Sequence, residues 1–392
     1  MERVMWNEVV VVPLLGWPLM VTLGSSFVLV VAATALGWSR VRGPRAVRVL
    51  QRAALVGSSQ ALVVLLLAAG ANNYGYFYGS WSDLFGGSSQ AAVALPPTHG
   101  GPGPRQGHVG AAGALPAVKS GPTSWSTPTE WATRGRVDTV TVRGARSDLS
   151  EQALVYLPPA YFQPASAHRT FPAVEVMTGY PGVVANLVQR QHYPDTLLTE
   201  MGQRRAGPMV LVMLRPTVAP PRDTECTDVP AGPQALTYLA EDVPSAVESA
   251  YRVRPTGWGA MGDSTGGYCA VKLAMAHSDV FSTAVSLSGY YHTLRDTTTG
   301  DLWGGSSVLR DLNSPEWLLA HQPAPPVSVL ATIGTAEKGH TGISDTRHFL
   351  SLVRSPMSVT SVVIPGGGHN FHSWSTVMGP AFDWLSKRLH AA

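Results

Sequence analysis

The pentapeptide at 262–266 constrains this chain more than any other stretch, because it reads Gly-Asp-Ser-Thr-Gly and matches the motif Gly-x-Ser-x-Gly. In that motif a serine occupies a sharp turn between a strand and a helix, with its hydroxyl exposed above the sheet. Residues 254–261 are typical of a strand that enters such a turn, and residues 268–277 are rich in good helix formers. Because both flanks fit, we expect Ser264 to be a nucleophile and its neighbouring glycines to relieve crowding at a strained turn.

Strand-like and helix-like stretches alternate from residue 137 to the end of the chain. The expected strands are 137–142, 153–157, 173–177, 209–214, 254–261, 283–287, 327–333 and 359–364, and the expected helices are 195–205, 236–251, 268–277, 345–353 and 374–389. Alternation of this kind indicates a mostly parallel sheet with helices on both faces. With a serine turn in the middle, the sequence predicts an α/β-hydrolase fold.

In that fold the catalytic residues follow the chain order serine, acid, histidine. The acid should therefore come after a late strand, and Glu337 closely follows the strand expected at 327–333. Asp345 is the alternative acid. A carboxylate at that position also has an ordinary capping role, because Asp345 would begin the next helix. We therefore favour Glu337 as the acid.

The histidine of the triad should follow the last strand, where a glycine turn at 366–368 leads into His369. His372 is the alternative, and it lies nearer the closing helix. In the predicted triad His369 takes the proton of Ser264 during attack and later returns one to the leaving group. Glu337 holds the imidazole in the required tautomer and stabilises the imidazolium.

The tetrahedral intermediate of such a reaction needs two N–H donors for its oxyanion. The backbone N–H of Thr265, which directly follows the nucleophile, is expected to be one of them. The other should come from the loop at 178–182, after the third expected strand. Because Pro181 has no N–H, we predict that Tyr180 supplies the second donor.

The N-terminal region is far more apolar than the rest of the chain, and residues 9–38 carry no charge. We predict membrane spans at 16–37 and 53–72, since about 20 apolar residues cross a bilayer. Five arginines lie between these spans at positions 40–52, and the positive-inside rule places them in the cytoplasm. We therefore expect a cell-membrane protein whose C-terminal domain is on the extracytoplasmic side.

Between the apolar region and the alternating region the composition changes to glycine, proline, alanine and serine with little periodicity. Such a stretch is typical of a flexible tether. Part of it, around residues 125–131, carries tryptophans that could pack on the catalytic domain. The expected domains are a two-span anchor at 1–85, a linker at 86–134 and a catalytic domain at 135–392.

The two cysteines and the net charge lead to two further expectations. The two cysteines, Cys226 and Cys269, both belong to the C-terminal region. An even number in an exported domain favours a disulfide between them, and two buried thiols are the alternative. The net charge of +3 is small and no basic stripe stands out, so nucleic-acid binding is not expected.

Several of these motifs together resemble the esterase D-like family of α/β-hydrolases, which also contains the secreted mycobacterial mycolyltransferases. The resemblance covers roughly residues 137–389. The motifs that carry it are Val-Tyr-Leu-Pro-Pro at 155–159, Thr-Gly-Tyr at 178–180, Gly-Asp-Ser-Thr-Gly-Gly at 262–267, and Gly-His at 368–369 with Trp374 following. The segments at 223–226 and 267–269 resemble membrane-anchored actinobacterial members. The resemblance implies the triad and oxyanion donors given above, with no cofactor and no metal.

Three functions fit this sequence. The first is an extracytoplasmic serine esterase that hydrolyses carboxylic esters through an acyl-enzyme on Ser264. The second is an acyltransferase, similar to the mycolyltransferases, that passes the acyl group to a sugar or lipid alcohol. The third is a surface-binding domain without activity, against which the complete triad argues. An anchor in the membrane makes a lipid or a cell-envelope glycolipid a reasonable ester substrate for either enzyme.

Overall fold

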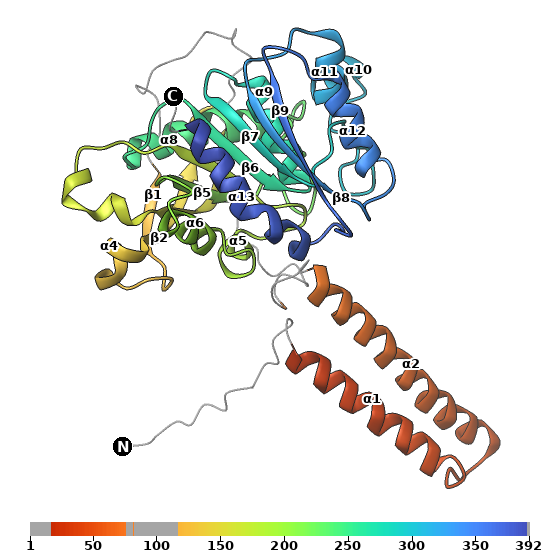
Figure 1. Cartoon of the computed structure of the whole chain (residues 1–392). Helices are drawn as coiled ribbons and strands as arrows, with labels where there is room; N and C mark the ends of the chain where they lie inside the picture. Colours follow the sequence, from red (N-terminus) through yellow and green to blue (C-terminus); the bar gives the residue numbers. More distant parts are fainter. Residues whose placement is uncertain (1–16, 76–80, 82–116, 390–392) are drawn as a thin grey trace. The chain divides into compact units, whose positions relative to one another are not determined.

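The computed structural model describes residues 17–75, 81 and 117–389, and the chain divides into two compact units, residues 1–90 and 91–392 (Figure 1). Residues 1–16, 76–80 and 82–85 of the expected anchor and residues 86–116 of the expected linker lie outside the described residues.

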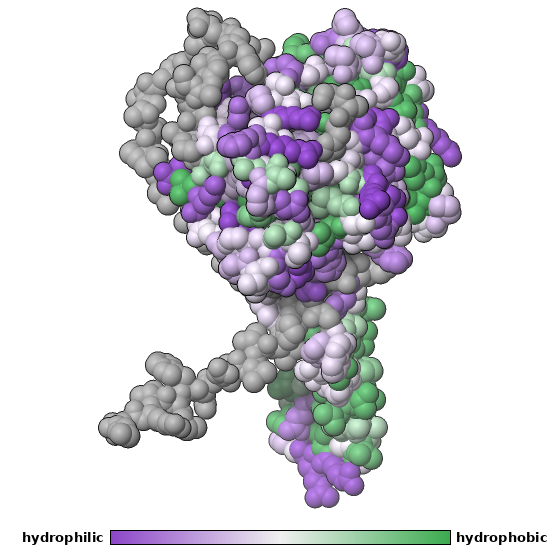
Figure 2. Space-filling view, turned by 60° about the vertical axis from the view of Figure 1, so that its left-hand side comes forward, coloured by the Kyte–Doolittle hydropathy of each residue, from purple (hydrophilic) through white to green (hydrophobic). Residues whose placement is uncertain are grey.

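The N-terminal unit is a pair of helices, α1 (Trp17–Gly37) and α2 (Arg45–Gly75). Buried Leu19 and Ala69 lie where the helices pack together, and most other apolar side chains of the pair are exposed, as the green surface in Figure 2 shows. Both helices are long and apolar enough to cross a membrane by length and composition. The arginine stretch is only partly a loop, because α2 begins at Arg45 and so extends well before the span expected at 53–72.

The second unit contains a nine-stranded sheet in the order β1-β2-β3-β5-β4-β6-β7-β8-β9. The strands are β1 (Val118–Pro122), β2 (Arg136–Arg143), β3 (Ser150–Leu157), β4 (Ala173–Met177), β5 (Val210–Leu214), β6 (Trp258–Asp263), β7 (Phe281–Leu287), β8 (Ser328–Gly334) and β9 (Ser358–Ile364). The first three strands are antiparallel, and the pairs from β5 to β9 are all parallel. The predicted α/β-hydrolase fold, a mostly parallel sheet with helices, is therefore confirmed.

Strand β1 changes the expected domain boundary. It lies inside the stretch predicted as a linker at 86–134, yet it pairs with β2 in an antiparallel register that joins Val118 to Thr141. The aromatic segment that follows it also belongs to this unit, since Trp125 packs edge-on against Tyr156 of β3 at 5.5 Å between ring centroids. The sheet unit therefore includes residues from 117 onward, not only those from 135.

Helices cover both faces of the sheet. The helices are α4 (Trp131–Arg134), α5 (Val184–Gln189), α6 (Tyr193–Gly202), α7 (Ala235–Thr237), α8 (Val243–Ala250), α9 (Thr265–Ala276), α10 (Ser307–Leu312), α11 (Pro315–His321), α12 (Ile343–Leu352) and α13 (Phe371–Leu389), with a π-helical turn at Tyr238–Asp242 and 3₁₀ turns at Pro128–Glu130, Pro159–Phe162 and Pro164–Ser166. One apolar core lies between the sheet and α5, α6 and α13, and the other lies under α8, α9, α11 and α12. Figure 1 shows α13 crossing one face of the parallel strands.

The central strand β4 buries a carboxyl group without a partner. Glu175 is completely buried between β5 and β6, and neither carboxyl oxygen has a hydrogen-bond partner among the described residues. Burial raises its pKa well above the ordinary value, so the folded protein holds this carboxyl protonated. The unfolded chain loses that proton near pH 4.5, and folding stability therefore decreases as the pH rises above that value toward the folded pKa.

Replacing Glu175 with methionine should stabilise the protein, because the change removes an unpaired buried polar group and keeps a similar volume. We expect a gain of about 1–3 kcal/mol in the free energy of unfolding at neutral pH. The gain should be larger at pH 8 than at pH 5, and urea unfolding at the two pH values measures both. Glu248→Met on α8 is the matched control. An equal gain at both pH values would show that Glu175 does not titrate as described.

Candidate active site

The serine turn predicted from the sequence connects β6 to α9. Ser264 has φ 54° and ψ −122°, a left-handed backbone conformation that costs free energy for a residue with a side chain. The neighbouring glycines are required by space: a Cβ on Gly262 would lie 2.5 Å from the carbonyl carbon of Gly266, and one on Gly266 would lie 2.4 Å from the Met177 oxygen. The close contacts at these glycines make the turn tight, and half-buried Ser264 lies on it at the carboxyl end of the parallel strands.

His369 joins the serine to an acid. Its Nε2 lies 2.9 Å from Ser264 Oγ, and its Nδ1 lies 2.7 Å from Glu337 Oε2. The histidine follows β9 in the glycine turn, and its ring packs edge-on against Trp374 of α13 at 5.1 Å between ring centroids. An imidazole held in this way can accept the serine proton at one nitrogen while the carboxylate fixes the tautomer at the other.

The acid is held by its own set of donors. Glu337 lies in the loop after β8 with a buried side chain, and its Oε1 accepts hydrogen bonds from Ser288 Oγ at 2.7 Å and the Gly334 N–H at 2.9 Å. These two donors leave Oε2 directed to His369 and keep the carboxylate from rotating. Ser288 also follows a strand, β7, so three neighbouring strand ends build this part of the site.

The alternative triad residues lie elsewhere. Asp345 accepts a hydrogen bond from the Tyr291 N–H at 3.0 Å, and its Oδ1 lies 2.6 Å from His292 Nδ1, so it belongs to a different cluster. His372 is in the first turn of α13, and among the described residues its side chain has no hydrogen bond to Ser264 or Glu337. The structure thus brings together the three residues that the sequence favours and separates the two alternatives from them.

The two expected oxyanion donors belong to segments next to the nucleophile. Thr265 is the first residue of α9, where a backbone N–H has no acceptor within the helix. Tyr180 lies in the loop after β4, and its hydroxyl donates to the Pro221 carbonyl at 2.6 Å. A Cβ on Gly179 of this loop would lie 3.0 Å from Ser264 Cβ, so the loop closely approaches the serine.

A buried aspartate that the sequence reasoning did not identify supports this loop. Asp263 accepts a hydrogen bond from the Gly179 N–H at Oδ2 and one from Gln191 Nε2 at Oδ1, both at 3.0 Å. Burial raises the pKa of Asp263 to about 6, while the hydrogen bonds from Gln191 and Gly179 act in the opposite direction. At neutral pH the carboxylate is therefore charged and can accept both bonds.

Replacing Asp263 with asparagine should lower kcat, because an amide oxygen can accept only one of these two bonds and its NH₂ group repels the other donor. We expect a decrease of about tenfold to a hundredfold, less than the loss of an oxyanion donor itself. Steady-state kinetics with a p-nitrophenyl ester measures the effect. Asp148→Asn, at an exposed position, is the matched control. An unchanged kcat in the Asp263 variant would show that this anchor does not position the loop.

A buried polar cluster lies beneath the other side of the nucleophile turn. Thr265 Oγ1 donates to Asp223 Oδ2 at 3.1 Å, and Tyr290 Oη donates to Glu225 Oε1 at 2.6 Å. Lys272 Nζ donates to the Glu225 carbonyl at 3.0 Å. Burial raises the pKa of Asp223 to about 6 and lowers the pKa of Lys272. This cluster fixes the start of α9 against the loop at 223–228.

A disulfide joins the same loop to the same helix. Cys226 and Cys269 are bonded, with their Cα atoms 5.8 Å apart and both side chains completely buried. This is the pair that the sequence favours, and the alternative of two free thiols is not found. Because Cys269 lies in the second turn of α9, the disulfide constrains the helix that begins at the nucleophile.

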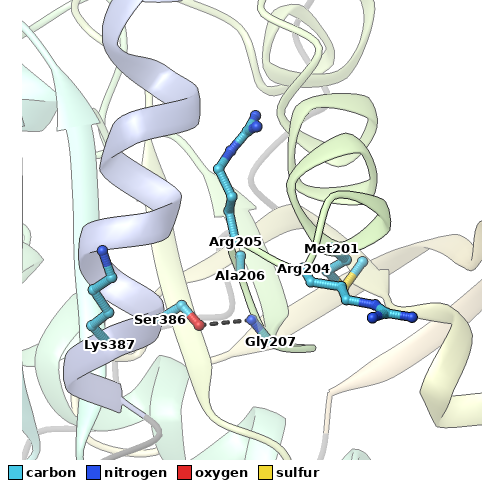
Figure 3. Close-up of a pocket in the computed structure, with 7 residues that line it drawn as sticks. All are labelled: Met201, Arg204, Arg205, Ala206, Gly207, Ser386 and Lys387. Atoms are coloured by element: carbon cyan, nitrogen blue, oxygen red, sulfur yellow. Dashed lines mark hydrogen bonds between the residues drawn. The ribbon is translucent and has the colours of Figure 1, made fainter.

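A separate hollow of about 610 Å³ lies at the other end of α13 (Figure 3). Its lining residues are Met201, Arg204, Arg205, Ala206, Gly207, Ser386 and Lys387. Ser386 is fifteen residues beyond the start of α13 at Phe371, which corresponds to about 20 Å along the helix axis. Two of its basic side chains have acidic partners, Glu200 for Arg205 and Asp383 for Lys387. This hollow is therefore not part of the serine site.

A mostly parallel sheet with a strained serine at its carboxyl edge, within hydrogen-bonding distance of a histidine, is the architecture of the α/β-hydrolases. A family model for esterases matches residues 148–382, more than half of the chain, and the protein belongs to this Esterase family. This agrees with the resemblance to the esterase D-like group that the sequence motifs indicate. A search of the curated proteins finds no match.

Solved structures of similar fold are enzymes of the same architecture. An S-formylglutathione hydrolase from Agrobacterium tumefaciens has a TM-score of 0.57 at 15% identity, with 69% of this chain and 99% of that chain covered. A ferulic acid esterase has a TM-score of 0.54 at 16% identity, with 66% and 99% covered. FphF, a fluorophosphonate-binding serine hydrolase from Staphylococcus aureus, has a TM-score of 0.52 at 15% identity, with 64% and 98% covered. At these identities the likeness shows the fold.

Proposed function

We propose that this protein is a serine esterase that hydrolyses carboxylic esters through an acyl-enzyme on Ser264. The observation that carries the proposal is the position of His369, whose two ring nitrogens lie 2.9 Å from Ser264 Oγ and 2.7 Å from Glu337 Oε2. A serine hydroxyl is a weak nucleophile by itself, and an adjacent base oriented by a carboxylate is the arrangement that activates it. Membership of the Esterase family and the fold of the solved neighbours support an ester as the substrate.

The reaction has two halves. Ser264 Oγ attacks the ester carbonyl and transfers its proton to His369 Nε2, and the N–H groups of Thr265 and Tyr180 stabilise the oxyanion. The intermediate collapses to the acyl-enzyme as the alcohol leaves with the proton from His369. Water then attacks the acyl carbonyl and gives a proton to His369, and Ser264 leaves with that proton when the acid is released. The Glu337 carboxylate stabilises the imidazolium in both halves.

Hydrolysis and acyl transfer share the formation of the acyl-enzyme, so the test must measure whether the acyl group then passes to water or to an acceptor. The full-length protein, purified in detergent, is given p-nitrophenyl esters of short and long acyl chains, with and without glycerol or a sugar as acceptor. An esterase releases p-nitrophenol and free acid at a rate that the acceptor does not change. Faster release with acceptor, together with an acylated acceptor by mass spectrometry, would instead establish an acyltransferase. Release of neither product would contradict the proposal.

We also propose that the helices α1 and α2 anchor the enzyme in the cell membrane with the sheet unit on the extracytoplasmic side. The apolar exposed surface of the helices supports the anchor (Figure 2), and the arginines between them support its orientation. The disulfide supports the same side, because disulfides persist in oxidising compartments. Protease added outside intact spheroplasts should digest the sheet unit. Digestion only after the cells are lysed would place that unit in the cytoplasm.

A further inference from the structure

Two carboxylates and a histidine meet outside the catalytic triad. His292 follows β7, Glu316 is in the first turn of α11, and Asp345 is in the first turn of α12. Each offers one ligand atom, and these atoms all lie within 4.8 Å of one another. The three residues are far apart in the sequence, so the fold itself assembles the cluster from three elements.

One oxygen of the second carboxylate in the cluster has no hydrogen-bond partner among the described residues. Asp345 has partners at both oxygens, the Tyr291 N–H and His292 Nδ1. Glu316 Oε1, in contrast, is buried and has no hydrogen-bond partner among the described residues. A buried carboxylate oxygen beside a second carboxylate is unfavourable unless a proton or a cation lies between them.

A fourth possible ligand lies on the same helix as Asp345. His348 is three residues further along α12, and residues at this spacing share one face of a helix. Its Nε2 lies 4.0 Å from Glu316 Oε2, and its side chain is 60% exposed. The face of α12 that carries Asp345 and His348 is therefore directed at Glu316.

We propose that His292, Glu316, Asp345 and His348 form a structural site for a divalent transition-metal ion, with Zn²⁺ as the preferred ion. Two imidazoles and two carboxylates are a ligand set that Zn²⁺ accepts in tetrahedral geometry, whereas Ca²⁺ and Mg²⁺ prefer oxygen ligands alone. With metal–ligand bonds of about 2.0 Å, tetrahedral ligand atoms are about 3.3 Å apart. The ligand atoms of His292, Glu316 and Asp345 lie within 4.8 Å of one another, and His348 Nε2 lies 4.0 Å from Glu316 Oε2, so the side chains would adjust toward this separation when the ion binds.

The proposed site would join α11 and α12 to the segment that follows β7. That segment also supplies Ser288, which donates to the proposed triad acid Glu337. A bound ion would therefore stabilise the region beside the triad without touching the serine or its histidine. This role is distinct from the ester chemistry, and the metal proposal stands or falls independently of the proposed function.

The test measures zinc bound to the full-length protein, purified in detergent without a polyhistidine tag and stripped with EDTA. After equilibrium dialysis against buffered Zn²⁺, elemental analysis should find about one zinc per chain, the occupancy of a single site. Zinc at a hundredfold excess over its Kd should also raise the unfolding temperature by roughly 5 °C. Parallel dialysis against Ca²⁺ should leave the protein without bound metal.

Substitutions at the proposed ligands test which residues bind the zinc ion. Glu316→Gln should abolish retained zinc and the shift in unfolding temperature. His348→Ala, at an exposed position, should weaken zinc binding at least tenfold, because loss of a direct ligand should cost no less than loss of a residue that only supports a ligand. The matched control is His321→Gln on α11. The His321 ring is hydrogen-bonded to the Trp317 carbonyl of the same helix and stacks on the Trp317 ring. The proposal is wrong if wild-type protein retains no zinc, if calcium binds in its place, or if both variants bind zinc as the control does.

Discussion

Replacing Ser264 with alanine should lower kcat for ester hydrolysis by about 10⁴- to 10⁶-fold, the range for loss of a serine nucleophile in an enzyme of this type. The reason is that alanine cannot form the acyl-enzyme, whatever else the site retains. The variant should fold normally, because Ser264 is half-buried and its hydroxyl bonds only to His369 among the described residues. Removing the side-chain oxygen does not change the φ of 54° that the turn requires.

Two measurements check this result. Steady-state kinetics with a p-nitrophenyl ester gives kcat, and a fluorophosphonate probe should label the wild-type protein and not the Ser264 variant. Ser249→Ala, at an exposed position on α8, is the matched control and should keep both activity and labelling. Adding His369→Ala to the Ser264 variant should cause little further loss, since the two residues act as one unit. A kcat within tenfold of wild type would mean that another residue is the nucleophile.

Much of the fold could be predicted because the strands from β4 to β8 are buried on both faces and read as short apolar runs. Each of the eight expected strands overlaps one of β2 to β9. The exception is β1, whose sequence Val-Lys-Ser-Gly-Pro has no alternation, because it is an edge strand with largely exposed side chains. The short helices α10 and α11 were also missed, since six or seven residues are too few to show a helical period.

The candidate site likewise contains residues that could be predicted from the sequence and residues that could not. The nucleophile, histidine and acid could be proposed because chain order and strand ends restrict the search, and the geometry agrees with the favoured set. Asp263 and Ser288 could not be proposed from the sequence, because their hydrogen-bond partners are far away along the chain. Gly179 and Asp263 are 84 positions apart, and Ser288 and Glu337 are 49 apart. For the His292 cluster the one local signal is the three-residue spacing of Asp345 and His348, which is too common to carry a prediction.

Removing the disulfide should destabilise the protein by about 4 kcal/mol, the value expected when a cross-link closes a loop of this length. The two cysteines are 43 residues apart, so the bond greatly restricts the unfolded chain between the loop and α9. Loss of the disulfide should also affect catalysis. Asp223 in that loop accepts a hydrogen bond from Thr265, the residue that supplies the expected oxyanion donor, so a looser loop should lower kcat as well as stability.

The double variant Cys226→Ala/Cys269→Ala tests both effects by urea unfolding and ester kinetics. Alanine leaves small cavities in place of the sulfurs, so dithiothreitol treatment of wild-type protein separates the covalent bond from its packing. Reductant should lower the stability of the wild type and leave the double variant unchanged, since the sequence contains no other cysteine. If reduced wild type unfolds at the same urea concentration as oxidised protein, the cross-link does not stabilise the fold. If stability decreases and kcat does not, the Asp223 contact is held by packing instead of by the disulfide.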